Sequence, residues 1–254
     1  MSQIILTDKE HIAKSRVCLA LDGIEGVDDA LKLANELREY VGTFKVGKEL
    51  HVIAGNEGRN IVRELKERGI DSFLDLKFHD TPATVYNASR AASVRGVYMF
   101  NVHVAGGEKM CRKAVEGANE NARFMGIERP KVIGVTVLTS LDDLDLTTLG
   151  YGYQLDTLVK RNTALAQEWG LDGVVCPANK AGALEKEFGN KFLYVTPGIS
   201  YGGVQGVGQK QIYDPAQAVK DCKNSILVIG SAITKAEDRR KTAYEILQSM
   251  AKNL

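Results

Sequence analysis

The stretch Phe73-Leu74-Asp75-Leu76-Lys77-Phe78-His79-Asp80-Thr81 places charged residues inside an otherwise apolar run. Side chains of a strand alternate between its two faces, so Asp75 and Lys77 point the same way, about 7 Å apart. Leu74, Leu76 and Phe78 take the opposite face and are expected in the packed core. A carboxylate and an ammonium in a low-dielectric site are costly unless they are paired. The stretch therefore predicts a buried strand that carries a functional charge pair.

Short apolar runs alternate with amphipathic stretches along the rest of the chain. The amphipathic stretches repeat apolar residues at three- and four-residue intervals, which is typical of helices. The expected strands cover residues 17–21, 43–46, 72–76, 97–102, 132–137, 173–176, 192–195 and 226–229, and the clearest helices cover residues 28–40, 60–68, 82–94, 108–121, 155–168 and 236–250. Such units predict an α/β fold, the (β/α)8 TIM barrel. A doubly wound open sheet is the alternative, but the first strand ends in Leu21-Asp22-Gly23-Ile24, without the glycine-rich fingerprint of that fold.

Length and composition fit one barrel. The chain has 254 residues, 44% of them hydrophobic, and no linker divides it, so we expect a single domain over residues 1–254. The 33 basic and 32 acidic residues leave a net charge of +1, which favours neither nucleic acid nor a membrane surface as a partner. No apolar stretch approaches the ~18 residues of a membrane span, and no signal-peptide core precedes Arg16. With four scattered cysteines, typical of a reducing compartment, these features predict a cytoplasmic protein.

Polar and charged residues recur at the expected carboxyl ends of the strands, where barrel enzymes carry their chemistry. In chain order they are Asp22, Lys45, Asp75 with Lys77, His103, Thr139, Pro197 and the Gly230-Ser231 step. One aspartate at such a place is typical of a helix cap or turn, but Lys45 lies inside an apolar strand. Alternating lysines and aspartates keep the lysines protonated and the acids ionised. They predict that Lys77 donates a proton beside the fixed charge of Asp75, and that no metal ion binds between the two lysines.

Three further features are less specific. His79, past the strand end, is expected to make a structural hydrogen bond, whereas His103 fits a core position and a mouth-lining position equally well. The seventh strand leads into a glycine-rich loop over residues 200–211, and the eighth ends near Gly230. Loops after these strands often bind phosphate through backbone N–H groups, so we expect a phosphate site there, with the long loop as a lid.

Together these motifs resemble the orotidine 5′-monophosphate decarboxylase family. Asp75-Leu76-Lys77-Phe78-His79-Asp80 is similar to the family signature, and the similarity extends over nearly the whole chain. It includes Leu19-Ala20-Leu21-Asp22, Phe44-Lys45-Val46-Gly47, Asn101-Val102-His103, Leu138-Thr139-Ser140, Val195-Thr196-Pro197-Gly198-Ile199, Gln209 and Val228-Ile229-Gly230. The resemblance implies a barrel homodimer that decarboxylates orotidine 5′-monophosphate to UMP, the last step of de novo pyrimidine biosynthesis, without cofactor or metal.

The resemblance also implies roles for individual side chains. Asp22 and Lys45 bind the ribose, and Lys45 is also bonded to Asp75. Asp75 lies against the departing carboxylate, while Lys77 protonates C6 of the pyrimidine. Asp80 and Thr81 reach into the partner's site. Thr139 contacts the pyrimidine, and Gln209 lies in the lid. Pro197, Gly230 and Ser231 complete the substrate-binding set.

Two positions depart from the family pattern. Ser200 and Ser231 stand where arginine is common, and the second of these arginines grips the substrate phosphate. Loss of one charged hydrogen bond costs about 1.5–3 kcal/mol, roughly ten- to a hundred-fold in binding. Backbone N–H groups, or Tyr201, Lys210 or Lys235, are the candidates to replace it.

Two other functions stay open. One is a Mg2+-dependent decarboxylase or aldolase of the same superfamily that acts on keto-sugar phosphates. Its acid-x-Lys-x-x-Asp motif usually continues into Ala-Gly, whereas this chain continues into Thr81-Pro82. The other is a non-catalytic nucleotide-binding barrel, which the two serines suggest and the intact charged residues oppose.

Overall fold

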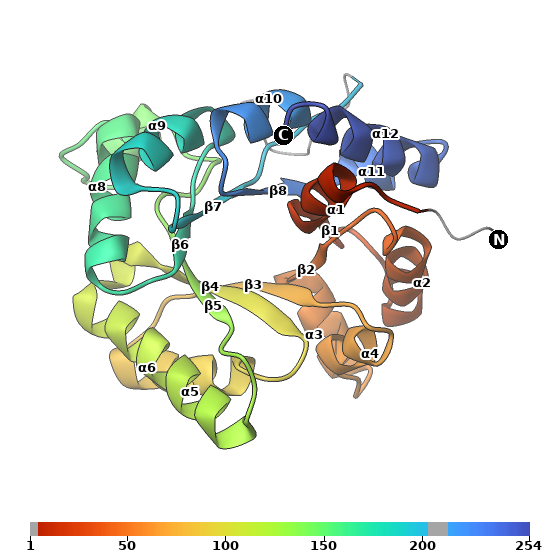
Figure 1. Ribbon diagram of the computed structural model, residues 1–254. Coiled ribbons are helices and arrows are strands. Elements are labelled where there is room, and N and C mark those ends of the chain that lie inside the picture. Colours follow the sequence, from red (N-terminus) through yellow and green to blue (C-terminus); the bar gives the residue numbers. More distant parts are fainter. Residues whose placement is uncertain (1–4, 203–212) are drawn as a thin grey trace.

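Eight parallel strands form a closed barrel in the computed structural model, which describes residues 5–202 and 213–254. Each strand pairs with its neighbours in sequence, and β8 (Ser225–Ile229) closes the sheet by pairing with β1 (Val17–Ala20). Figure 1 shows the helices as a ring around this sheet. Closure confirms the TIM barrel and excludes the doubly wound sheet, which would keep two unpaired edges.

The expected strands are all present, each within two residues of its predicted bounds. The other strands are β2 (Thr43–Gly47), β3 (Ser72–Phe78), β4 (Val97–His103), β5 (Lys131–Val135), β6 (Gly173–Val175) and β7 (Leu193–Thr196). The helices that the sequence predicts are α2 (Val27–Leu37), α4 (Ile61–Glu67), α5 (Pro82–Ala92), α6 (Glu108–Met125), α8 (Leu155–Glu168) and α12 (Arg239–Ala251).

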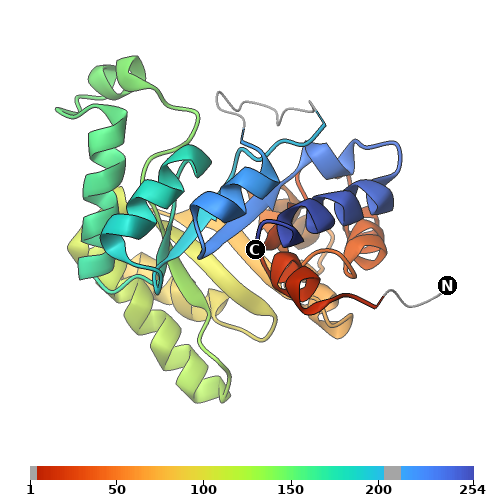
Figure 2. The ribbon, with the colours of Figure 1, turned by 45° about the horizontal axis from the view of Figure 1, so that its top comes forward.

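The sequence did not delimit the remaining helices. They are α1 (Asp8–Ser15), α3 (Lys48–Asn56), α7 (Asp143–Thr148), α9 (Ala178–Phe188), α10 (Pro215–Asp221), α11 (Ser231–Thr234) and the 3-10 helix η1 (Val104–Gly106). These segments have few large apolar residues, so the recurrence of apolar residues at helical spacing does not stand out. Figure 2 shows α1 beside α12, near both ends of the chain. Within the described ranges, no helix is long and apolar enough to cross a membrane.

The core has two parts, one on each face of the sheet. Inside the barrel lie buried side chains from alternate strand positions, namely Cys18, Ala20, Phe73, Met99, Ile133, Val135, Val175, Leu193, Val195, Ile226 and Val228. The outward-facing residues pack against the helices in a larger cluster. All four cysteines are buried free thiols. The barrel below its mouth is therefore filled with apolar side chains, which is typical of this fold.

Strand β3 is not the regular strand that the sequence predicts. Its pairing with β4 shifts register between Leu74 and Phe78, so that a bulge interrupts the ladder. Lys77, inside the bulge, has a φ of 52° and is the one non-glycine residue with positive φ in the described part of the chain. This conformation costs about 1–2 kcal/mol for an L-residue. The bulge also explains why Leu76 and Phe78 are only partly buried, where simple alternation predicted core positions.

Close packing of α5 on α6 gives a test of the fold. A Cβ added at Gly117 of α6 would lie 2.4 Å from the carbonyl oxygen of Tyr86 in α5. We expect Gly117→Ala to lower the free energy of unfolding by about 1–3 kcal/mol in urea denaturation, because the helices must move apart. Gly55→Ala in α3 is the matched control, since its new Cβ meets nothing within 4 Å. Equal stability of the Gly117→Ala and wild-type proteins would contradict this helix contact.

Candidate active site

A cavity of about 220 Å³ opens at the carboxyl ends of the barrel strands. Its walls are apolar, from Phe73, Val135, Val175, Val195 and Val228, which belong to the barrel core just below or beside the mouth. The polar residues that line it are those the sequence singled out, namely Asp22, Lys45, Asp75, Lys77 and Thr139, together with Pro197 and Gly230. The cavity therefore holds a concentrated set of charges within an apolar frame.

Three neighbouring strand ends bring two lysines and two aspartates together. The Lys45 ammonium, from β2, lies 2.7 and 2.8 Å from the two carboxylate oxygens of Asp22, which follows β1. It also lies 3.1 Å from Asp75 Oδ2. On the other side of the same carboxylate, Lys77 Nζ donates to Asp75 Oδ1 at 2.6 Å. The charges thus form one chain in which positive and negative groups alternate.

Burial differs along this chain of charges. The side chains of Lys45 and Asp75 are 9% and 11% exposed, while those of Lys77 and Asp22 are 27% and 56% exposed. Burial alone would raise the pKa of Asp75, but Lys45, Lys77 and its hydrogen bonds hold that pKa below its ordinary value. Burial likewise opposes the charge of Lys45, yet Asp75 and Asp22 raise its pKa. Both groups are therefore charged at neutral pH, and Lys77 is the more accessible cation.

Two residues that sequence reasoning did not assign support this arrangement. Asn101, in β4, is 1% exposed and donates from Nδ2 to Asp75 Oδ1 at 2.7 Å. Its Oδ1 accepts from the backbone N–H of Lys77 at 2.7 Å. Gly47, at the end of β2, leaves room for the ion pair, since a Cβ there would lie 2.8 Å from Asp22 Oδ1. A polar residue between Phe100 and Val102 was the signal for Asn101, because the same pattern had drawn attention to Lys45.

Other predicted site residues lie outside this cavity or outside the described chain. Asp80 and Thr81 are exposed beyond the end of β3, where Thr81 caps α5 by accepting from the N–H of Thr84. Ser231 is the first residue of α11, next to the lining residue Gly230. Gln209, and with it most of the expected lid, lies outside the described residues.

The two histidines lie beside each other, close to Lys77. The ring centres of His79 and His103 are 5.1 Å apart, with His79 exposed and His103 partly buried. Burial lowers the pKa of His103 to about 4, and the nearby His79, Lys77 and Lys48 add to this shift. His103 is therefore neutral at physiological pH. Among the residues that the structure describes, the His79 side chain has no hydrogen-bond partner, so the structural hydrogen bond expected of it is not confirmed.

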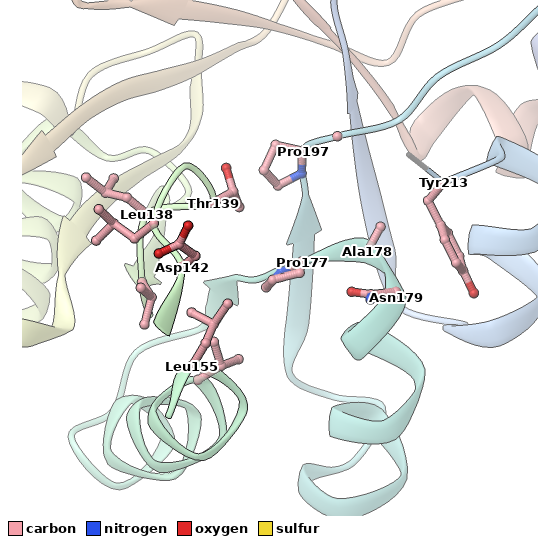
Figure 3. A pocket seen from close by; sticks show the side chains of 13 residues that line it. Leu138, Thr139, Asp142, Leu155, Pro177, Ala178, Asn179, Pro197 and Tyr213 are labelled. Carbon is pink, nitrogen blue, oxygen red and sulfur yellow. The ribbon is translucent and has the colours of Figure 1, made fainter. Parts of the chain in front are cut away.

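A second, larger cavity of about 440 Å³ adjoins the first (Figure 3). The two share Val137, Leu138, Thr139 and Pro197. Beyond these residues the second cavity extends between the loops after β5, β6 and β7, toward Leu155, Asn179 and Tyr213. It lacks the charged network, so the smaller cavity is the candidate site for chemistry. In the described chain, no three His, Cys, Asp or Glu side chains gather as metal ligands.

Fold and site together define a (β/α)8 barrel with a lysine–aspartate–lysine cluster at its mouth. The model of the "Orotidine 5'-phosphate decarboxylase / HUMPS family" matches residues 15–246. The orotidine 5'-phosphate decarboxylase of Aliivibrio fischeri (strain MJ11) is 42% identical over 236 residues, or 93% of this chain and 97% of the relative. That of Syntrophus aciditrophicus (strain SB) is 39% identical over 98% of this chain and 97% of the relative.

Comparison of structures agrees with the comparison of sequences. The crystal structure of orotidine 5'-phosphate decarboxylase from Lactobacillus acidophilus matches with a TM-score of 0.79 and 29% identity, over 92% of this chain and 98% of that chain. The chain belongs to the orotidine 5'-phosphate decarboxylase / HUMPS family.

The lowered pKa of His103 predicts a pH dependence of stability. The unfolded imidazole takes up its proton near its ordinary pKa, before the folded one does, so stability falls as the pH drops from about 6.5 toward 4. The slope from this group is at most about 1.4 kcal/mol per pH unit. We expect urea unfolding at several pH values in this window to give a flatter dependence for His103→Gln than for the wild type. The same substitution at the exposed His51 is the control, and parallel curves for His103→Gln and wild type would contradict the assignment.

Proposed function

We propose that this chain decarboxylates orotidine 5′-monophosphate to UMP. The observation that carries the proposal is the Lys77–Asp75 pair, 2.6 Å apart at the cavity mouth, in a chain of this family. The names of the curated relatives support the same reaction and do not favour a keto-sugar-phosphate substrate. The non-catalytic alternative gains no support from the site, because all four charged residues of the cluster are in place, namely Asp22, Lys45, Asp75 and Lys77.

The proposed chemistry follows from where charge appears and disappears. The bond between C6 and the carboxylate breaks, CO2 leaves, and the electron pair stays on C6. The Lys77 ammonium lies beside this carbanion and stabilises it more than the neutral ring, which lowers the barrier. Lys77 then gives its proton to C6 and regains one from water. Asp75 opposes the substrate carboxylate through like charge, and this repulsion disappears as CO2 departs.

The remaining residues of the site have proposed roles in binding. Asp22 and Lys45 hold the ribose hydroxyl groups; Asp22 is the most exposed member of the cluster and is paired with Lys45. Thr139 offers its hydroxyl to the pyrimidine, and Pro197 also lines the cavity. Gly230 and Ser231 are at the end of β8, where barrels commonly bind phosphate, and Gln209 is assigned to the substrate by resemblance alone.

The function is tested by a metal-free assay. In EDTA, we expect the wild-type protein to consume orotidine 5′-monophosphate, followed by loss of the orotate absorbance. Lys77→Ala should reduce kcat by at least about a thousand-fold, because it removes both the stabilising charge and the proton. Lys113→Ala, which removes an exposed ammonium on α6, is the charge-matched control and should keep wild-type turnover.

Three outcomes would count against the proposal. Turnover by Lys77→Ala within ten-fold of wild type would contradict the role of this lysine. A strict requirement for Mg2+ would favour the sugar-phosphate alternative. Tight UMP binding with no turnover at millimolar substrate would favour the non-catalytic barrel.

The proposal includes a homodimer whose sites are shared. Asp80 and Thr81 belong to the signature segment, yet they are exposed and do not line the cavity of their own chain. They lie directly after β3, beyond the bulge that carries Lys77. Placement of Asp80 and Thr81 in the site of a second protomer would account for both observations, and the family resemblance supports it.

Mixed dimers test the shared site. Asp80→Ala and Lys77→Ala protomers, each inactive alone, should regain about a quarter of wild-type activity when exchanged at equal concentration, because half of the dimers keep one complete site. Lys77→Ala mixed with a protomer carrying both substitutions is the control and should stay inactive. No recovery, after mass spectrometry has shown subunit exchange, would contradict a shared site.

A further inference from the structure

One residue of β4 stands opposite the whole bulge of β3. Phe73 and Leu74 pair with Met99 and Phe100, and the pairing resumes at Phe78 and Val102. Between these pairs, three residues of β3, including Asp75 and Lys77, face Asn101 alone. The normal ladder of backbone hydrogen bonds cannot continue across such a mismatch. Whatever fixes Lys77 relative to Asp75 must therefore come from the side chain of Asn101 and from the charges themselves.

The Asn101 amide bonds to both sides of the charge pair at once. Its Nδ2 donates to Asp75 Oδ1 at 2.7 Å, and its Oδ1 accepts from the Lys77 backbone N–H at 2.7 Å. The orientation of the amide is set by chemistry, because the reverse would bring two donors together at Lys77 and two acceptors together at Asp75. The side chain is 1% exposed, so water cannot replace either bond.

We propose that Asn101 is a positioning residue for the proton transfer. It holds the Asp75 carboxylate and the strained backbone of Lys77 in one arrangement, and so directs the ammonium to the reacting carbon. This inference rests on the proposed decarboxylation. The inference goes beyond the proposed decarboxylation, because it assigns to a β4 residue a positioning role that neither the Lys45–Asp75 nor the Lys77–Asp75 ion pair supplies. Without Asn101, Lys77 would keep its charge but lose its fixed geometry, and small displacements of a catalytic group are costly in rate.

The neighbourhood of Asp75 limits which changes are informative. Lys45 from β2 and Lys77 from β3 contact the carboxylate directly. Cys18 of β1 and His103 of β4 are close enough to interact with it electrostatically. Asp22 acts on it through Lys45. An aspartate in place of Asn101 would add a second carboxylate against Asp75. Like charges raise the pKa of one member of such a pair, so the introduced group takes up a proton at moderately acidic pH. Once protonated, it matches the amide, with a hydroxyl that donates to Asp75 and an oxygen that accepts from Lys77.

Steady-state kinetics of Asn101→Ala and Asn101→Asp test the proposal. We expect Asn101→Ala to lower kcat by about ten- to a hundred-fold, with KM within about three-fold of wild type. Asn101→Asp should be impaired more strongly near pH 8, and should recover toward wild type as the pH falls to about 5.5, since protonation restores the missing donor. Asn162→Asp is the matched control. Asn162 is a buried amide of α8 that donates to the carbonyl of Thr136 and does not touch the charge cluster.

Several results would overturn the proposal. They are kcat within three-fold of wild type for both variants, a loss in Asn101→Asp that is the same at every pH, or an equal loss in Asn162→Asp. If the wild type does not convert the substrate at all, the proposed function fails and a second measurement decides the inference. In a carboxylate 13C NMR titration, Asn101→Ala should raise the pKa of Asp75 above its wild-type value, and an unchanged pKa would contradict a positioning role.

Discussion

The site depends on one carboxylate held between two ammonium groups inside the barrel. Asp75 is 11% exposed, and a charge in such a place is tolerated only while its partners stay where they are. Those partners come from both sides. Lys45 is on β2, and Lys77 and the amide of Asn101 are bound to the same oxygen from β3 and β4. Removal of either lysine leaves a buried charge partly uncompensated, and such losses typically cost about 3–5 kcal/mol. The register of three neighbouring strands therefore decides the chemistry at the mouth.

The backbone conformation at Lys77 and Gly47 allows the contacts between the lysines and the aspartates. Lys77 adopts a φ of 52°, which a lysine tolerates only because the surrounding structure fixes it. Gly47 lacks the Cβ that would collide with Asp22, so Asp22 can reach Lys45 across the strand ends. Beneath these residues the barrel is filled by buried apolar side chains such as Phe73 and Met99. This strained residue lies where the proposed reaction takes place.

Much of this could be predicted from the sequence, for identifiable reasons. Closure into eight parallel strands follows from apolar runs separated by helical periods, and all eight runs were found. The charged residues of the site could be predicted because Lys45, Asp75 and Lys77 interrupt such runs. The bulge could not, because a change of one backbone φ leaves no mark on the hydrophobic pattern. Nor could the bonds of Asn101, since its identity shows a polar group in the barrel but not which two atoms it joins.

The position at which the proposed substrate would react can be observed directly. The most direct test is a crystal structure with UMP bound. The account predicts that Lys77 Nζ lies within about 3.5 Å of pyrimidine C6, the distance of a near-attack arrangement. Asp75 should lie on the side of C6 from which CO2 leaves, with the ribose against Asp22 and Lys45. A pyrimidine whose C6 faces away from Lys77, or a ring bound only in the larger cavity beyond Thr139, would contradict it.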